Sequence, residues 1–286
     1  MIDLKRLYKE HCEKYEVPFS EETSILSYDD STLFCPAGMQ KFKKQFKDDS
    51  YTDTIANIQP CLRLNDLDLL GDGTHFAYFD MMGLFSFREQ PLSWAVDFWL
   101  SFINDILNLR LSKVTIHPDK ISDWRRYYMC HVEQITPDSE CIWSDGDIGG
   151  YCTEFYINHN GQDVEIGNIV NPLGNSIDCG FGAERIKNII NNTIPKTKLE
   201  LLEECLIKII DCGIIPSNKK HGYILRKLFR DFIQNGGELN HKFFHSEKER
   251  LANIQSKYEK LKNKYFNKSE IWWYDTHGID INLIIK

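Results

Sequence analysis

Apolar residues recur with helical spacing at two places in the N-terminal half of the chain. Residues 2–15 place apolar side chains on one face of an otherwise charged segment, which predicts an amphipathic helix. Residues 90–108, QPLSWAVDFWLSFINDILN, combine the same spacing with Pro91 near the start, where proline suits the first helical turn. We therefore expect two helices in this half.

Runs rich in β-branched and aromatic residues predict strands around these helices. The expected strands cover residues 57–64, 75–87, 111–117, 151–158, 163–170 and 175–179. The first two flank NDLDLLGDGT and so predict a long hairpin, whose loop is polar enough to face a ligand. The first 190 residues are therefore expected to form a mainly antiparallel sheet flanked by helices.

The pattern becomes entirely helical after the polar segment NNTIPKTK. Two segments with apolar stripes follow, LELLEECLIKII and GYILRKLFRDFIQ. Residues 246–249 resemble a capping box ahead of an apolar seam that runs from Leu251 to Tyr265, more typical of bundle packing than of a coiled coil. We expect an α+β fold with two domains, residues 1–192 and 193–286, of which the second is helical.

The distribution of charge along the chain is uneven, and only the helical part is basic. The 286 residues carry a formal net charge of −8, which by itself argues against a nucleic-acid-binding protein. Residues 219–268, however, hold 13 Lys and Arg against 5 Asp and Glu, a local charge of +8 that leaves −16 for the remainder. This segment could bind a polyanion, although a solvated helical surface explains the same composition.

The nine cysteines are scattered singly, without a C-x-x-C pair. Their odd number and an N-terminus without the apolar core of a signal peptide indicate reduced thiols and a cytoplasmic location. The same spacing predicts no zinc site. No apolar run approaches the roughly 18 residues that a membrane span needs, so we expect a globular protein without a membrane segment.

Two glycines and an arginine stand where a strand gives way to a helix. In NSIDCGFGAERIKNII (residues 175–190), CGFGA directly precedes Glu184 and Arg185. Glycines allow a ligand to approach closely, and a helix N-terminus favours anions. An arginine there opposes the helix dipole, and a nucleotide phosphate would compensate for it. A glycine-rich turn with a solvated arginine explains the same residues.

Arg63 and Phe79 lie near facing ends of the predicted hairpin strands. Together with Arg185 they suggest a nucleotide held by two arginines, because guanidinium groups offer forked donors to phosphates and a ring opposite a guanidinium can clamp a base. Taken singly, Phe79 would be a core residue and Arg63 a surface ion pair.

Six segments carry a family resemblance: LFCPAGMQKFK (33–43), CLRLNDLDLLG (61–71), YFDMMGLFSF (78–87), IDCGFGAER (177–185), IIPSNKKHGYILRKLFR (214–230) and WYDTHGIDINL (273–283). They resemble, in the same order, successive blocks of the alanyl-tRNA synthetases, a class II family. The resemblance runs from near residue 2 to near residue 284. It implies a class II catalytic domain over residues 1–192 and a helical domain for recognition of the tRNA acceptor stem over residues 193–286.

The resemblance also implies roles for individual residues. The residues expected to bind ATP are Arg63, Phe79, Asp80, Gly182 and Arg185. Arg63 would meet the α-phosphate, Phe79 would stack on adenine, and Arg185 would lie on the other face of adenine and near the γ-phosphate. These two arginines are the expected catalytic residues. The amino acid would be bound by Met39, Trp143, Asn168, Val170, Asp178 and Gly180, with Asp178 on the α-ammonium group.

The activity that the resemblance implies is ATP-dependent formation of an aminoacyl-adenylate, with alanine the first candidate, and transfer to the 3′ end of a tRNA. Positioning, arginines and Mg²⁺ would stabilise the developing charge, without a protein nucleophile; no metal ligand is assigned. The tRNA contacts would come from Asn218, Arg226, Arg230 and Asp275, at a G3:U70 pair. A helix or turn cap at Asn218 and an N-cap at Asp275 are the alternatives.

The chain departs from the family pattern in four respects. It ends where the editing and C-terminal domains would begin, which indicates a truncated form that lacks both. The Gly-Gly-Lys-His segment expected after Arg63 is missing, and the loop at residues 145–154 is short. Gly167 stands where the family has tryptophan. The missing ring would reshape a nearby pocket, so the amino acid is left open.

Two other functions stay open at this point. One is an enzyme that adenylates an amino acid and passes it to a different acceptor, such as a carrier protein. The other is a non-catalytic paralogue that binds tRNA or a nucleotide. The sequence fixes no oligomeric state and is compatible with a monomer.

Overall fold

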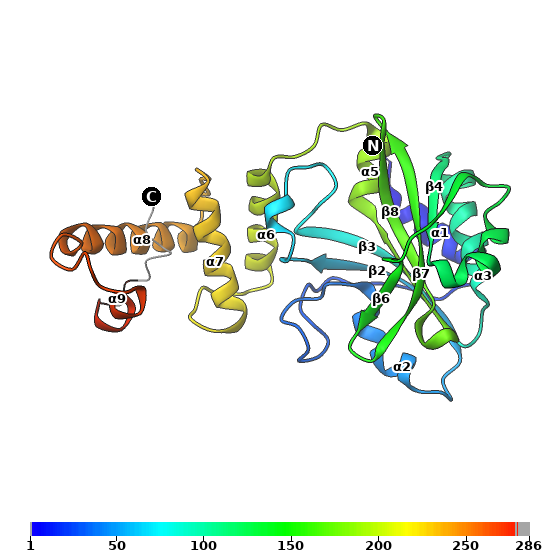
Figure 1. Cartoon of the computed structure of the whole chain (residues 1–286), viewed down its shortest axis with the longest axis horizontal. Helices are drawn as coiled ribbons and strands as arrows, with labels where there is room; N and C mark the ends of the chain where they lie inside the picture. Colours follow the sequence, from blue (N-terminus) through cyan, green and yellow to red (C-terminus); the bar gives the residue numbers. More distant parts are fainter. Residues whose placement is uncertain (1, 278, 280–286) are drawn as a thin grey trace. The chain divides into compact units, whose positions relative to one another are not determined.

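The computed structural model describes residues 2–277 and residue 279 (Figure 1). Part of the segment WYDTHGIDINL therefore lies outside the described residues. The chain divides into two compact units, Met1–Pro195 and Lys196–Lys286. The roles that the sequence assigns to its two domains remain predictions.

A mixed sheet, nine-stranded in the described part of the chain, forms the centre of the first unit (Figure 1). Its strands are β1 (Phe19–Glu21), β2 (Asp53–Leu62), β3 (Tyr78–Phe87), β4 (Leu111–Ile116), β5 (Val132–Pro137), β6 (Ile142–Asp145), β7 (Ile148–His159), β8 (Gln162–Val170) and β9 (Ser176–Gly182). The order is β1-β2-β3-β9-β8-β7-β4-β5, with β6 paired to β7. Only the outer pairs β1–β2 and β4–β5 are parallel among these strands. The predicted α+β class with a mainly antiparallel sheet is confirmed.

Helices α1 (Leu4–Lys14), α3 (Leu92–Ser101) and α5 (Ala183–Asn191) pack on one face of this sheet. Side chains alternate across the strands, so Met82 and Leu84 of β3 join this larger core while Met81 and Phe85 point to the other face. Phe181 of β9 stacks on a tryptophan of α3 at a centroid distance of 3.7 Å. This core fixes the strands on which the candidate site residues lie.

Shorter elements cover part of the opposite face. There the 3₁₀-helix Gly38–Phe42 and α2 (Lys43–Lys47) pack Phe42 and Phe46 against phenylalanines of β3. The remaining short elements are α4 (Ile121–Trp124), the π-helix Phe102–Ile106 after α3, and the 3₁₀-helices Leu67–Leu69, Pro118–Lys120, Arg125–Tyr127 and Pro172–Gly174. This face also carries the pocket described below.

The second unit is helical, with α6 (Lys198–Asp211), α7 (Lys220–Gln234), α8 (Lys242–Leu261) and α9 (Glu270–His277). Phe229 of α7 contacts Phe244 of α8 at a ring distance of 6.0 Å, and Tyr258 of α8 contacts Trp273 of α9 at 5.2 Å. None of the helices among the described residues has the length and apolar composition that crossing a bilayer requires.

The capping box predicted at residues 246–249 is wrong. Helix α8 begins at Lys242, and the ring of His241 accepts the capping hydrogen bond, so Ser246 lies inside the helix. A reciprocal capping box occurs instead at α6, where the Thr197 hydroxyl accepts from the Glu200 backbone and the Glu200 carboxylate accepts from the Thr197 backbone.

Candidate functional site

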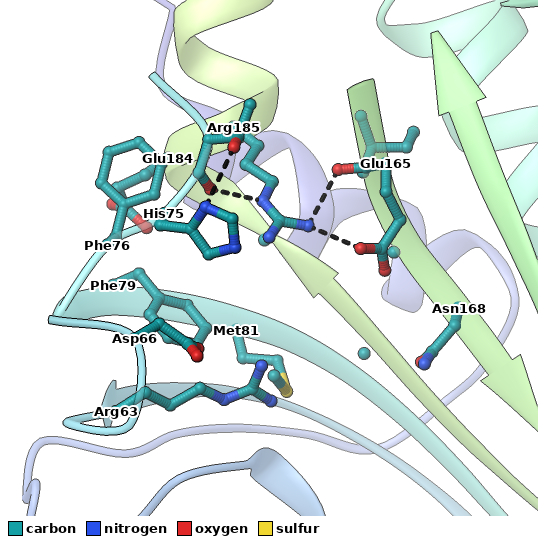
Figure 2. Close-up of a pocket in the computed structure, with 15 residues that line it drawn as sticks. Arg63, Asp66, His75, Phe76, Phe79, Met81, Glu165, Asn168, Glu184 and Arg185 are labelled. Carbon is teal, nitrogen blue, oxygen red and sulfur yellow. Dashed lines mark hydrogen bonds and ion pairs between the residues drawn. The ribbon is translucent and has the colours of Figure 1, made fainter. Parts of the chain in front are cut away.

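A pocket of about 100 Å³ lies on the face of the sheet opposite α1, α3 and α5, bordered by β3, β8, β9 and the loop between β2 and β3 (Figure 2). Six residues predicted from the sequence line it: Arg63, Phe79, Asn168, Gly180, Gly182 and Arg185. They come together because β3 pairs with β2 on one side and with β9 on the other, and β9 pairs with β8. Segments more than 100 residues apart in the chain thus form one site.

Arg185, at the start of α5, is the most connected of these residues (Figure 2). Its Nε donates to the Thr74 carbonyl at 2.8 Å, and its Nη1 donates to the Glu165 carbonyl at 3.0 Å. The same Nη1 forms an ion pair with the Glu165 carboxylate at 2.9 Å. The interpretation as a solvated arginine is therefore wrong, because a carboxylate compensates its charge and a loop carbonyl fixes its orientation.

Arg63 extends from the end of β2 into the same pocket (Figure 2). Its Nε donates to the Pro36 carbonyl at 2.9 Å, and its guanidinium carbon lies 5.2 Å from the centre of the Phe79 ring. Within the part of the chain that the structure describes, Arg63 forms no ion pair, so the surface ion-pair alternative is wrong. Two guanidinium groups and one aromatic ring therefore line a cavity, as a nucleotide site requires.

His75 is a pocket residue that the sequence reasoning missed. Its Nδ1 lies 2.5 Å from the Asp72 carboxylate, which also accepts from the backbone of Thr74 and of His75. Partial burial opposes ionisation of Asp72, but these hydrogen bonds outweigh it and lower the pKa of Asp72 to about 2. The only sequence signal for His75 is its position just before the strand that carries Phe79.

Three carboxylates also line the pocket, those of Asp66, Glu165 and Glu184. Glu184 is partly buried, which raises its pKa, and it accepts a hydrogen bond from the Asp80 backbone at 2.7 Å. Mg²⁺ prefers oxygen ligands and in nucleotide sites binds one or two carboxylates together with phosphates. The carboxylates of this pocket therefore fit a magnesium–nucleotide complex. Glu165 is the one that already lies beside Arg185.

Asp178 lies on the same face of β9 but does not line this pocket. Its side chain is buried, opposite Phe85 of β3 and Val170 of β8 in the sheet register. No hydrogen bond to its carboxylate occurs among the described residues. Burial, reinforced by the nearby charge of Asp145, raises the pKa of Asp178 to about 7. A buried carboxylate of this kind favours a cationic partner such as an ammonium group.

The remaining predicted amino-acid-binding residues do not line the Arg63–Arg185 pocket. Met39 is buried in the cluster around the 3₁₀-helix that begins at Gly38, and Val170 is buried beside two cysteines. Trp143 is partly buried and contacts both clusters. Asp145, which the sequence analysis missed, lies near enough to Asp178 for its charge to raise the pKa of Asp178, and it is held by Lys43 at 2.9 Å and Gln40 at 2.5 Å.

Asp80 is the predicted ATP-binding residue that the structure does not bring to the pocket. Because side chains alternate along β3, Phe79 and Met81 line the pocket while Asp80 points to the opposite face of the sheet. There Lys5 of α1 forms an ion pair with it at 2.9 Å. Asp80 contributes to the site only through its backbone amide, which binds Glu184.

Gly167 does not enlarge the pocket in the way expected from the sequence. A Cβ atom built at Gly167 would lie 2.4 Å from ring carbons of Phe181, which belongs to the core on the opposite face of the sheet. A side chain here would therefore point into that core, so the expectation that a missing ring reshapes the pocket is wrong. Glycine instead lets the Phe181 ring lie against the β8 backbone.

We expect Gly167→Ala to lower the free energy of unfolding by about 1–3 kcal/mol, the usual cost of overpacking a core. Urea denaturation measures it. Gly182→Ala is the matched control, because its Cβ would lie 3.8 Å from the nearest side-chain atom, in ordinary contact. Equal stability of the Gly167→Ala protein and wild type would mean that Phe181 moves at no cost.

The four residues predicted to contact tRNA lie in the second unit. Asn218 and Asp275 are exposed. Neither caps a helix, because Lys219 is the N-cap of α7 and Asp275 lies within α9, so the helix-cap alternatives are wrong. Arg226 donates to Asn218 Oδ1 and to Glu247 of α8, at 3.2 Å for the latter. The guanidinium of Arg230 lies 6.0 Å from the Tyr223 ring.

Known proteins resemble this chain over most of its length. The alanine--tRNA ligase of Buchnera aphidicola subsp. Baizongia pistaciae is 28% identical over 330 residues, which cover 87% of this chain and 38% of that protein. The alanine--tRNA ligase of Francisella tularensis subsp. novicida is 28% identical, with 88% and 38% covered. The chain thus spans about 38% of the length of these curated relatives.

Among solved structures, apo Staphylococcus aureus histidyl-tRNA synthetase is 10% identical with a TM-score of 0.42, over 87% of this chain and 82% of that one. At this score the likeness carries no further conclusion. The sequence profile of the class II (A) tRNA synthetases matches residues 10–168. Because that match covers more than half of the chain, the chain belongs to the class II (A) tRNA synthetase family.

Proposed function

We propose that this protein activates an amino acid with ATP, alanine being the first candidate, and transfers it to the 3′ end of a tRNA. The observation that carries the proposal is the convergence of Arg63, Phe79 and Arg185 on one pocket in a class II chain. The alanine--tRNA ligases among its relatives support alanine as the substrate.

The residues divide the adenylation step between them. Arg63 and Arg185 would bind the phosphates and stabilise the charge that develops as the amino-acid carboxylate attacks the α-phosphate. Phe79 would stack on adenine, and Asp178 would bind the α-ammonium group. Magnesium, held by pocket carboxylates with Glu165 foremost, would supply charge neutralisation at the phosphates. No side chain has to form a covalent intermediate, because positioning and electrostatics supply the catalysis.

ATP–pyrophosphate exchange with each of the twenty amino acids, without tRNA, tests the adenylation step. Exchange with alanine alone would support the proposal in full. Exchange with a different amino acid would support adenylation and replace alanine as the substrate. No exchange in protein that still binds ATP would contradict the proposal and favour a non-catalytic nucleotide-binding protein.

The helical unit would contact the acceptor stem of the tRNA. Asn218 and Asp275 are exposed polar residues that could meet base edges at G3:U70, and Arg226 and Arg230 would lie near phosphates. The surplus of basic residues between 219 and 268 supports a polyanionic partner. The free thiols of this chain fit a reducing compartment such as the cytoplasm.

We expect Asn218→Ala and Asp275→Ala each to lower the rate of tRNA charging, by roughly 10–100-fold for a lost base contact of about 1–3 kcal/mol. Pyrophosphate exchange should stay unchanged, because neither residue belongs to the nucleotide pocket. Asn253→Ala, an exposed asparagine of α8, is the control. Intact exchange in wild type without charging of any tRNA would direct attention to another acceptor, such as a carrier protein.

A further inference from the structure

Two buried cysteines and a glutamate converge beside the predicted amino-acid-binding residues. The thiols of Cys141 and Cys152 and a carboxylate oxygen of Glu154 all lie within 4.8 Å of one another. Cys152 and Glu154 alternate on β7 and so point to the same face, and Cys141 directly precedes β6, which pairs with β7. A 2.8 Å hydrogen bond from the Cys152 amide to the Cys141 carbonyl fixes the two segments together.

Hydrogen bonds orient two of the three groups, Cys141 and Glu154. Thr115 of β4 lies opposite Glu154 in the sheet register, and its hydroxyl donates to Glu154 Oε2 at 3.1 Å. The same hydroxyl oxygen accepts from the Cys141 thiol at 3.1 Å. Tyr156 donates to Glu154 Oε2 at 2.6 Å. Metal sites in proteins commonly have such an arrangement, in which residues that do not bind the metal hold the metal-binding side chains in position through hydrogen bonds.

In the described part of the chain, no basic side chain is paired with these acidic groups. Cys141 and Cys152 are buried, Glu154 is partly buried, and within the described part of the chain none of the three takes part in an ion pair. Two thiols that can ionise and one carboxylate would together bring up to three negative charges into a low-dielectric site. A metal ion is the partner that would make this arrangement favourable.

We propose that Cys141, Cys152 and Glu154 form a zinc site, with water as the fourth ligand. Zinc accepts thiolate sulfur at about 2.3 Å and carboxylate oxygen at about 2.0 Å, and three protein ligands leave one tetrahedral position open. Softer thiolate ligands select zinc over magnesium. The spacing of the cysteines along the chain hides this site, because Cys141 and Cys152 are brought together by strand pairing rather than by a local C-x-x-C turn.

The site is distinct from the nucleotide pocket but lies close to the predicted amino-acid-binding residues. Cys152 stands opposite Val170 of β8, and Val170 stands opposite Asp178 of β9. The zinc would therefore lie on the same face of the sheet as Asp178 and two strands away from it, at roughly 10 Å. Its binding can be measured without any assay of amino-acid activation.

The test is the metal content of the full chain, purified without an affinity tag that binds metal. We expect close to one zinc per chain by elemental analysis, and a near-ultraviolet thiolate-to-cobalt absorption band after exchange with Co²⁺. Cys141→Ser and Cys152→Ser should each lower the metal content by roughly tenfold or more. Cys130→Ser, at an exposed cysteine, is the matched control and should keep the metal.

X-ray absorption at the zinc edge of the wild-type protein gives a second readout that needs no variant to fold. We expect two sulfur and two oxygen neighbours. A shell of four sulfurs, or one without sulfur, would overturn the assignment. Wild-type protein that neither retains zinc nor shows the cobalt band would overturn the site itself, as would undiminished zinc in the Cys141→Ser, Cys152→Ser double variant.

Discussion

Asp178→Asn should make the free protein more stable at pH 8 and at the same time strongly reduce amino-acid activation. Burial and the nearby Asp145 raise the pKa of Asp178 to about 7, from a reference value of 3.8. A carboxyl whose pKa is raised by folding stabilises the protein fully below the unfolded pKa. That contribution is lost as the pH rises through the folded pKa, because the folded state must then hold a buried charge. Asparagine carries no such charge.

The size of the stability effect follows from the shift in pKa. Between pH 5 and pH 8 the wild-type protein should lose roughly 2–3 kcal/mol of unfolding free energy through this one group. Urea denaturation at the two pH values measures the loss, and the Asp178→Asn protein should lack it. Asp30→Asn, at an exposed loop aspartate, is the control and should follow wild type. A pH profile identical in wild type and the Asp178→Asn protein would contradict the raised pKa.

The activity of the same variant tests the proposed role of Asp178. Loss of a charged partner for the α-ammonium should lower kcat/KM for the amino acid by roughly 10²–10³-fold in pyrophosphate exchange. In wild type, kcat/KM for the amino acid should fall as the pH drops below about 7, because protonated Asp178 no longer attracts an ammonium group. Exchange that stays within about tenfold of wild type would remove Asp178 from substrate binding.

The central strands could be predicted from the sequence because their signals are local. The hairpin of β2 and β3 has long apolar runs on both strands and a polar loop between them, and its register sets Cys61 opposite Phe79. Strands β1 and β5 were missed for physical reasons. β1 has three residues, and β5 is half exposed and forms a parallel pair with β4, which a local pattern does not encode.

The same distinction applies to the site. Arg63, Phe79 and Arg185 could be grouped because each stands at the end or start of a recognisable element. Alternation along a strand sends the side chains of Phe79 and Asp80 to opposite faces, so Phe79 lines the pocket and Asp80 does not, and its role in ATP binding stays a prediction. Asp145 could not be found, since its approach to Asp178 depends on how β6 folds back on β7. Long-range strand pairing decides such contacts.

Arg185→Lys should disable the proposed nucleotide pocket although it keeps the positive charge. Arginine here makes directed bonds from two nitrogens, to the Thr74 carbonyl in the β2–β3 loop and to Glu165 of β8. One ammonium cannot reproduce that fork. We expect the rate of pyrophosphate exchange to fall by roughly 10²–10³-fold, the usual effect of losing one aligned hydrogen-bond donor to a developing charge. Amide hydrogen exchange in residues 64–77 should become faster, because the loop loses the hydrogen bond that Arg185 donates to the Thr74 carbonyl.

The two readouts separate the two roles of Arg185. Arg6→Lys is the matched control, because Arg6 also pairs with a glutamate, Glu10, but on the exposed surface of α1. It should change neither exchange activity nor loop protection, as exposed pairs contribute little. Faster amide exchange with normal activity would make Arg185 a loop anchor without a part in catalysis. Normal amide protection of the loop together with lost activity would mean that Arg185 acts only on the nucleotide and does not anchor the loop. Wild-type behaviour in both would exclude Arg185 from the site.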